Sequence, residues 1–440
     1  MNAASQKVAL RARYVVPVAA PPLQNACVVM RGEQIEAVTA TPPADAEIVD
    51  LGSVAILPGL VNAHVHLEFS ALEERLGEAG MPLPAWIREV LAWRQRVAND
   101  PDGAVSTQDA LARGLAEAVR HGTTALGEIA TVNWRRNGEI GGTGPSRGPL
   151  DLPLDVTVFR ELIAPTSEPL RIAECMLTAG PHLAEGEVSK TWSAGLSPHA
   201  PYSAHPQLCE AVVRLHARSP FPVAIHLAES REELEWLAHG TGPLADLFDE
   251  LELPSPFAAS RRPLEVIEQL GGLSNTLFVH GNYLAPDEMA ALAERASTTA
   301  VVYCPRTHAY FGHEPYPLVE MLNAGVSVAL GTDGRGSNPD LSLLAEMRHV
   351  ARQHPEVPLA RILELGTLAG ARALGREAKA GSLTPGKVAN LAMIALPEGA
   401  TDDAYDMLLR ADTEVVATLV RGRPVFATDE TPLAAWAKSD

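Results

Sequence analysis

The sequence predicts an α/β fold, a (β/α)₈ barrel joined to a small β-sandwich domain that both ends of the chain form together. Two observations predict it. The middle of the chain alternates eight apolar, strand-like runs with helical patterns, whereas both ends are rich in short strands. We expect the composite domain over residues 1–57 plus 382–440 and the barrel over residues 58–381.

The two ends of the chain share one pattern. Near the N-terminus, residues 8–16, 26–30 and 34–38 alternate in polarity between turn-forming residues. Near the C-terminus, residues 390–394 and 414–420 also resemble short strands, and they flank turn-rich stretches. This similarity predicts that the two ends build one sheet-containing domain.

The middle of the chain predicts a parallel sheet that is buried on both faces, because near-continuous apolar strands are each followed by a helix. Ser106 with Asp109 forms a capping box at the start of one such helix, and Gly122 ends it. Eight strand-and-helix units indicate a closed barrel, and a doubly wound open sheet, the alternative, would not need eight strands. The predicted strands are residues 61–67, 123–129, 155–162, 192–197, 222–227, 276–280, 299–303 and 326–331.

Composition excludes several classes of partner. The chain has 440 residues, a formal charge of −19 and 46% hydrophobic residues. The negative charge argues against nucleic acid and against an anionic membrane surface. Four scattered cysteines form no C-x-x-C motif, and we find neither a signal peptide nor a spanning segment. We therefore expect a cytoplasmic protein with a small-molecule substrate, and whether it forms a homo-oligomer stays open.

One stretch interrupts the alternation. Residues 133–152 contain five glycines, two prolines and three arginines. We expect a long loop after the second strand, and a surface insertion is favoured over a lid for the active site.

Potential metal ligands gather at the predicted strand ends. His64 and His66 point to the same side of the first strand, because side chains alternate with period two. The fifth, sixth and eighth strands end at His226, His280 and Asp333. Each residue alone is more simply a buried histidine or a helix cap. Four strand ends that agree predict a metal site at the carboxyl face of the barrel.

With these residues in place, the sequence resembles the amidohydrolase superfamily, from Pro58-Gly59-Leu60 to the Gly381–Lys387 segment. The resemblance implies that His64, His66, His226 and Asp333 bind the metal and that His280 contacts the metal-bound water. The binuclear branch has a bridging lysine on strand four, and none occurs in residues 197–202. We therefore expect one divalent ion, with Zn²⁺ preferred and Fe²⁺ as the alternative.

The segment from His226 to Glu229 resembles the H-x-x-E motif of the deaminase branch. Hydrolysis of an aromatic C–NH₂ bond needs attack by hydroxide and protonation of the neighbouring ring nitrogen. The resemblance makes Glu229 the proton shuttle, Asp333 the acceptor of the water proton and His280 the group that stabilises the tetrahedral intermediate. The simpler alternative for Glu229 is a solvent-exposed acid at the start of a helix.

Candidate substrate contacts surround these strand ends. Residues 197–203 resemble a strand-four motif in which the histidine, here His199, contacts the substrate. Glu68 and Trp86 lie where the family builds its pocket wall, although Trp86 or Trp93 could equally pack in a core. Further polar candidates are Arg306 and His308 after strand seven, and Arg160 on strand three.

The closer resemblance is to aminodeoxyfutalosine deaminases and their chlorohydrolase-like relatives. It implies deamination of an adenine-like nucleoside, with aminodeoxyfutalosine of menaquinone biosynthesis as one candidate. Deamination of guanine, pterins or triazines and dechlorination are the alternatives, and a non-catalytic barrel scaffold is a remote one. One departure is Asn390, where the family's tail usually reads Ala-Asp-Leu.

Overall fold

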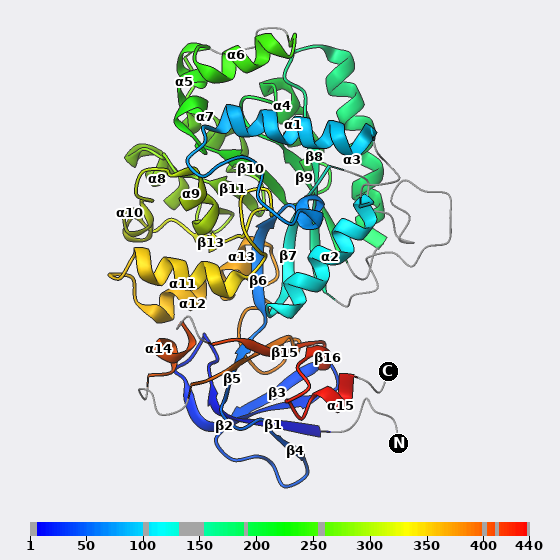
Figure 1. Cartoon of the computed structure of the whole chain (residues 1–440), viewed down its shortest axis with the longest axis vertical. Helices are drawn as coiled ribbons and strands as arrows, with labels where there is room; N and C mark the ends of the chain where they lie inside the picture. The colour runs from blue at the N-terminus through cyan, green and yellow to red at the C-terminus, as the bar shows by residue number, and fades with distance from the viewer. Residues whose placement is uncertain are drawn as a thin grey trace.

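The barrel and a separate sheet lie one above the other in a computed structural model that describes residues 7–99, 105–131, 154–188, 192–253, 260–397, 403–409 and 413–437 (Figure 1). The predicted loop at residues 133–152 lies outside the described residues. Within the described ranges, no helix combines the length and apolarity that crossing a bilayer requires.

The barrel contains the eight predicted strands, all parallel and in chain order around the sheet. Between the first and the last strand, the backbone N–H groups of Thr332 and Asp333 donate to the carbonyl of His64, so the barrel is nearly closed. The last strand is shorter than its predicted span. The strands are β6 (Leu60–Val65), β7 (Thr123–Ala130), β8 (Asp155–Leu162), β9 (Trp192–Pro198), β10 (Val223–Leu227), β11 (Thr276–His280), β12 (Thr299–Tyr303) and β13 (Val328–Leu330).

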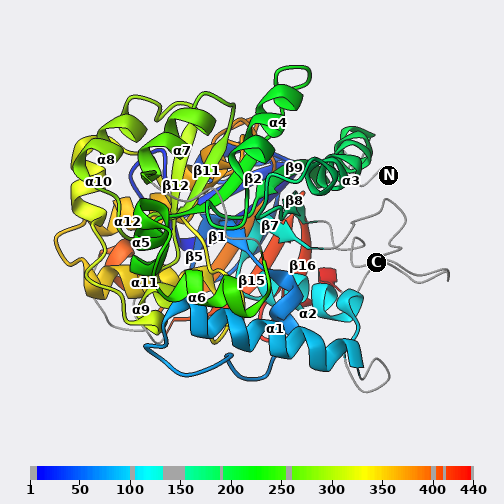
Figure 2. The ribbon, with the colours of Figure 1, turned by 90° about the horizontal axis from the view of Figure 1, so that it is seen from above.

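Helices surround these strands, as Figure 2 shows from above. The predicted cap is confirmed, because the Ser106 side chain accepts from the Asp109 backbone N–H and Gly122 follows with a φ of 86°. The helices are the 3₁₀ helix η2 (Leu67–Ala71), α1 (Leu83–Asn99), α2 (Thr107–Arg120), α3 (Pro169–Val188), α4 (Pro206–His216), α5 (Arg231–His239), α6 (Pro243–Glu250), α7 (Pro263–Leu270), α8 (Pro286–Ala293), α9 (Pro305–Phe311), α10 (Leu318–Ala324), α11 (Leu343–Gln353), α12 (Leu359–Leu365) and α13 (Leu368–Ala373).

Helices α1 and α6 lie beside each other over the barrel (Figure 2). Arg88 of α1 forms an ion pair of 2.7 Å with Glu250 of α6. Both helices have an apolar side, and these sides form one wall of the cavity described below.

The second sheet is built from both ends of the chain, as predicted. Strand β14 pairs antiparallel with β5, which places Leu391 opposite Pro58. Asn390 accepts from the backbone N–H of Arg421, so this departure from the family pattern lies in the sheet domain. The exact domain boundaries stay a prediction. The elements are β1 (Lys7–Val15), β2 (Leu23–Arg31), β3 (Gln34–Thr39), β4 (Glu47–Asp50), β5 (Val54–Pro58), β14 (Leu391–Ala395), α14 (Ala404–Leu408), β15 (Val415–Val420), β16 (Arg423–Ala427) and α15 (Ala434–Ala437).

Candidate metal centre and active site

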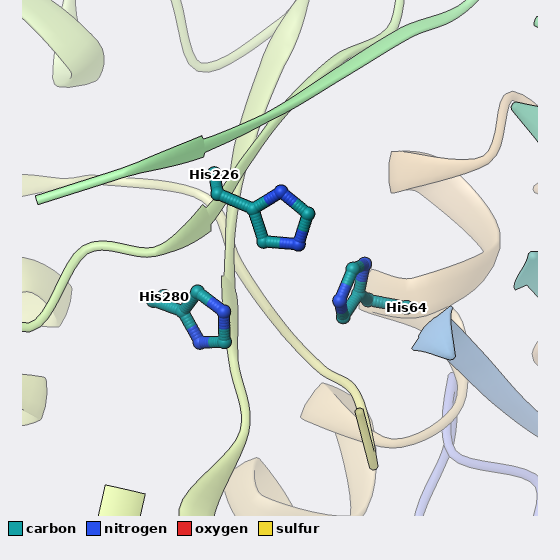
Figure 3. A group of neighbouring side chains, drawn as sticks. All are labelled: His64, His226 and His280. Atoms are coloured by element: carbon teal, nitrogen blue, oxygen red, sulfur yellow. The ribbon is translucent and has the colours of Figure 1, made fainter. Parts of the chain in front are cut away.

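The structure brings the predicted ligands together at the carboxyl ends of β6, β10, β11 and β13. Potential ligand atoms of His64, His66 and Asp333 lie within 4.8 Å of one another, and so do those of His64, His226 and His280. Figure 3 shows His226 and His280 side by side, facing His64. His280 is therefore as close to His64 and His226 as a direct ligand would be, although the sequence predicted contact through water.

The residues fit a divalent transition metal. Neither ring nitrogen of His64 has a hydrogen-bond partner among the described residues, although the side chain is only 1% exposed. The Nε2 atoms of His66 and His226 lie 3.3 Å apart. Buried polar atoms are rarely left without partners, and several imidazole nitrogens with one carboxylate suit Zn²⁺ or Fe²⁺. A metal at this position would bind one ring nitrogen of each histidine.

Neighbouring groups fix the orientation of the candidate ligands. Nδ1 of His226 lies 2.8 Å from the carbonyl of His199, which can only accept, so Nδ1 carries the proton and Nε2 keeps its lone pair. One carboxylate oxygen of Asp333 accepts from the Gly334 backbone N–H at 2.8 Å, and the other accepts from the Ser337 hydroxyl at 3.1 Å. These contacts orient both groups before any ion binds.

Burial lowers the pKa of the candidate histidine ligands. It lowers the pKa of His64, His66 and His280 well below 6.5, and that of His226 to about 4. The rings are therefore neutral at neutral pH, which is the form that binds metals.

The backbone is strained at three of these strand ends. Ala228, His280 and Asp333 have φ values of 52°, 72° and 57°, in the left-handed region that residues other than glycine rarely adopt. Such conformations persist when the surrounding structure holds them, and they concentrate at functional sites. Here they turn the chain sharply after β10, β11 and β13.

Glu229 lies inside the site. Its Oε1 is 3.4 Å from Nε2 of His280, and its side chain is 10% exposed. Burial raises the pKa of Glu229 well above its usual value, and the nearby charge of Asp333 adds to the effect. The exposed, helix-start interpretation of Glu229 is therefore wrong, because the α5 helix begins after it and the carboxylate faces the cavity.

A cavity of about 270 Å³ opens in front of these groups. His66, His226, Glu229, His280 and Asp333 line its inner end. Its outer wall is apolar and comes from α1 and α6, with Trp86, Ile87, Val90, Leu244, Leu247 and Phe248. The cavity is therefore polar where the chemistry would occur and apolar farther out, as ligand pockets commonly are.

Three of the predicted substrate contacts line this cavity: Glu68, Trp86 and His199. Glu68 accepts from Arg94 at 2.7 Å and from Thr131 at 3.1 Å. Nδ1 of His199 lies 2.5 Å from the Ser203 hydroxyl. Trp86 lines the cavity and also packs on Phe69 and Phe311, so both interpretations of this side chain hold.

Three predicted polar candidates are not among the residues that line the cavity. Arg306 forms ion pairs of 2.7 Å with Asp340 and with Glu346 behind the site. The N–H groups of its guanidinium are therefore already engaged and not available to a substrate. Arg160 donates to the backbone carbonyl of Thr131. His308 is likewise buried outside the cavity, edge-on to the stacked rings of Tyr303 and Tyr316.

Other residues at the site were missed in the sequence. Glu161 and Arg94 line the cavity, and Glu233 accepts from the backbone N–H groups of Ala228 and Glu229 at 3.0 and 2.7 Å. Glu161 could have been found, because it ends the third strand as the histidines end theirs. Arg94 lies in an amphipathic helix, where the sequence does not distinguish it from a solvent-exposed arginine. Glu233 lies three residues after Ser230, where an acidic residue commonly caps a helix and does not by itself indicate a functional site.

The amidohydrolase family model matches residues 55–425 of the chain. The chain belongs to the amidohydrolase family. The match covers the whole barrel and the strands of the second sheet that flank it.

Several relatives of the chain are named as deaminases. The aminodeoxyfutalosine deaminase of Nitratiruptor sp. is 28% identical over 374 residues, which cover 83% of this chain and 86% of the relative. The 5-methylthioadenosine/S-adenosylhomocysteine deaminase of Moorella thermoacetica is 27% identical over 404 residues, which cover 88% and 85%. Both relatives are thus named as deaminases, which are hydrolases that act on C–N bonds in cyclic amidines.

Solved structures share the fold. A zinc-bound adenosine deaminase from Xanthomonas campestris has a TM-score of 0.73 and 26% identity, over 97% of this chain and 94% of that chain. The aminofutalosine deaminase of Helicobacter pylori, in complex with methylthio-coformycin, has a TM-score of 0.78 over 95% and 100%. At 22% identity, the second likeness concerns the fold alone.

Proposed function

We propose that this enzyme hydrolytically deaminates an adenine-like nucleoside with the help of one divalent ion. The observation that carries the proposal is the buried pair of Glu229 and His280 beside the candidate ligands, at the inner end of a cavity with an apolar outer wall. A carboxylate beside a metal site can move a proton between water and a ring nitrogen. The scaffold alternative loses support, because all predicted ligands are present and converge.

The metal site would consist of His64, His66, His226 and Asp333, with His280 next to them. A divalent ion there would lower the pKa of a coordinated water and polarise the reacting carbon. We favour Zn²⁺ because the ligand types suit it and a related adenosine deaminase structure contains it. No described residue argues against Fe²⁺.

The protein's own groups would divide the remaining work. Asp333 would accept a proton from the attacking water, and Glu229 would deliver a proton to the ring nitrogen beside the reacting carbon. Burial raises the pKa of the Glu229 carboxyl, which favours its protonated form and suits a group that delivers a proton. His280 would donate to the oxygen that develops negative charge, and His199 would contact the substrate ring.

Aminodeoxyfutalosine is our first candidate substrate, and the similarity to the Nitratiruptor enzyme supports it. Adenosine, 5-methylthioadenosine and S-adenosylhomocysteine are second candidates, which the other deaminase relatives support. The apolar outer wall favours nucleosides with an apolar group over small free bases.

Ammonia release from purified, metal-loaded enzyme tests the proposal. A panel of these nucleosides, with guanine, a pterin and an amino-triazine as comparators, should give the highest kcat/KM for one of the nucleosides. Faster turnover of guanine, pterin or triazine would overturn the substrate class, and no ammonia from any of them would overturn the function.

A further inference from the structure

Glu161, near the end of β8, has a carboxylate whose hydrogen-bonding capacity is unused within the described chain. The side chain is only 6% exposed, yet it lines the cavity. The basic group found within 4 Å of it is Nε2 of His199, at 3.9 Å, which is too long for a hydrogen bond.

The other carboxylate on this side of the cavity is already satisfied. Glu68 accepts from Arg94 and from Thr131, at 2.7 and 3.1 Å. A buried carboxylate without donors costs free energy, and native structures seldom keep one unless a bound molecule or water satisfies it. Glu161 faces the cavity, so its hydrogen-bond donors come from water or from a molecule that binds there.

The charges around Glu161 limit what that molecule can present. A phosphate or carboxylate would be repelled by Glu68 and Glu161, since the nearby guanidinium groups of Arg94 and Arg160 are already engaged by Glu68 and by the carbonyl of Thr131. An ammonium group would be repelled by Arg94, whose positive charge acts on both carboxylates. Neutral hydroxyl groups avoid both costs, and they form short, strong hydrogen bonds to a carboxylate.

We propose that Glu161 accepts hydrogen bonds from sugar hydroxyl groups of the substrate and so determines specificity for an intact nucleoside. The inference rests on the proposed function, in which His199 contacts the ring: Glu161 lies beside His199, where a glycosyl group attached to that ring would be within reach. The same position disfavours a phosphate bonded directly to the sugar oxygens that Glu161 would contact.

Two substrates and two variants test this. Adenosine and 2′,3′-dideoxyadenosine share the reacting ring and differ only in the sugar hydroxyls. We expect wild-type enzyme to prefer adenosine, and Glu161→Gln and Glu161→Ala to lower kcat/KM for adenosine about ten- to hundredfold, the worth of hydrogen bonds to a charged group. Activity on the dideoxy compound should change less than threefold. Glu294→Gln, on a side chain that is 78% exposed, is the matched control and should change neither value.

Stability gives a second readout. Because Glu161 has no hydrogen bond in the described protein, Glu161→Gln should unfold at the same temperature as wild type or a higher one, while adenosine turnover falls. A glutamate with only a structural role would lower the melting temperature and both activities together, which would overturn the inference. Equal losses on both substrates, or no wild-type preference for the hydroxyls, would also overturn it while leaving deamination intact. No wild-type turnover of any nucleoside, with turnover of guanine, a pterin or an amino-triazine, would instead overturn the nucleoside proposal itself.

Discussion

Oε1 of Glu229 lies 3.4 Å from Nε2 of His280, and this contact joins the ends of β10 and β11 at the inner end of the cavity. Left-handed backbone conformations occur at Ala228, just before Glu229, and at His280 itself. The turn before Glu229 is held by Glu233, which accepts from two backbone N–H groups. The strand ends thus supply both the candidate ligands and the candidate proton carrier.

Glu229→Gln should keep the metal and lose most of the activity. The amide cannot carry the proton, and the loss of an acid–base group costs about 10²- to 10⁴-fold in rate. Ammonia release and metal content, measured on the same preparation, check this. Glu210→Gln, at an exposed position on α4, is the control. Loss of metal from Glu229→Gln would contradict the role that we assign to it.

Gly331→Ala should displace His64 and so weaken metal binding. An added Cβ would lie 2.9 Å from both Cβ and the carbonyl oxygen of His64, where β13 and β6 meet. Overpacking of this kind costs about 1–3 kcal/mol of stability, and the displaced His64 should bind metal more weakly. Metal titration and thermal unfolding measure the two effects. Gly272→Ala, with no atom near the new Cβ, is the control, and equal metal affinity in both variants would refute the prediction.

Arg306→Gln should destabilise the protein strongly. Arg306 pairs with the fully buried carboxylate of Glu346, which Asn338 also contacts at 2.7 Å. Removal of one partner from a buried pair leaves an uncompensated charge and costs about 3–5 kcal/mol. Denaturant unfolding checks this, with the half-exposed Arg372→Gln as control, where about 0–1 kcal/mol is expected. A small effect at Arg306, combined with a large rise in KM, would restore its predicted role in substrate binding.

The pH dependence of stability should reveal Glu233. Burial raises the pKa of this carboxyl to about 7 in the folded protein, from 4.5. Its ionisation therefore opposes folding, and its contribution to the free energy of unfolding falls as the pH rises from about 4.5 to 7. Glu233→Gln lacks this loss, so the stability of the variant relative to wild type should increase between pH 5 and pH 8. A constant difference across this range would show that the pKa is not raised.

The barrel was predictable because buried parallel strands leave continuous apolar runs, and all eight were found. The candidate ligands were predictable for the same reason, since each directly follows such a run. Side chains that reach the site from helices, such as Arg94, were not predictable. A charged residue on an amphipathic helix is most simply interpreted as exposed to solvent. Arg306 was assigned to the substrate because the sequence does not reveal that Glu346, 40 residues later, neutralises it.

The central claim is that this strand-end cluster binds one divalent ion and uses it to release ammonia from a nucleoside. The most direct test is a titration of metal-free enzyme with Zn²⁺, in which bound metal and ammonia release from the nucleoside panel are measured together. We predict that activity rises in proportion to bound metal and saturates at one ion per chain. Saturation at two ions, or full activity without metal, would contradict the account.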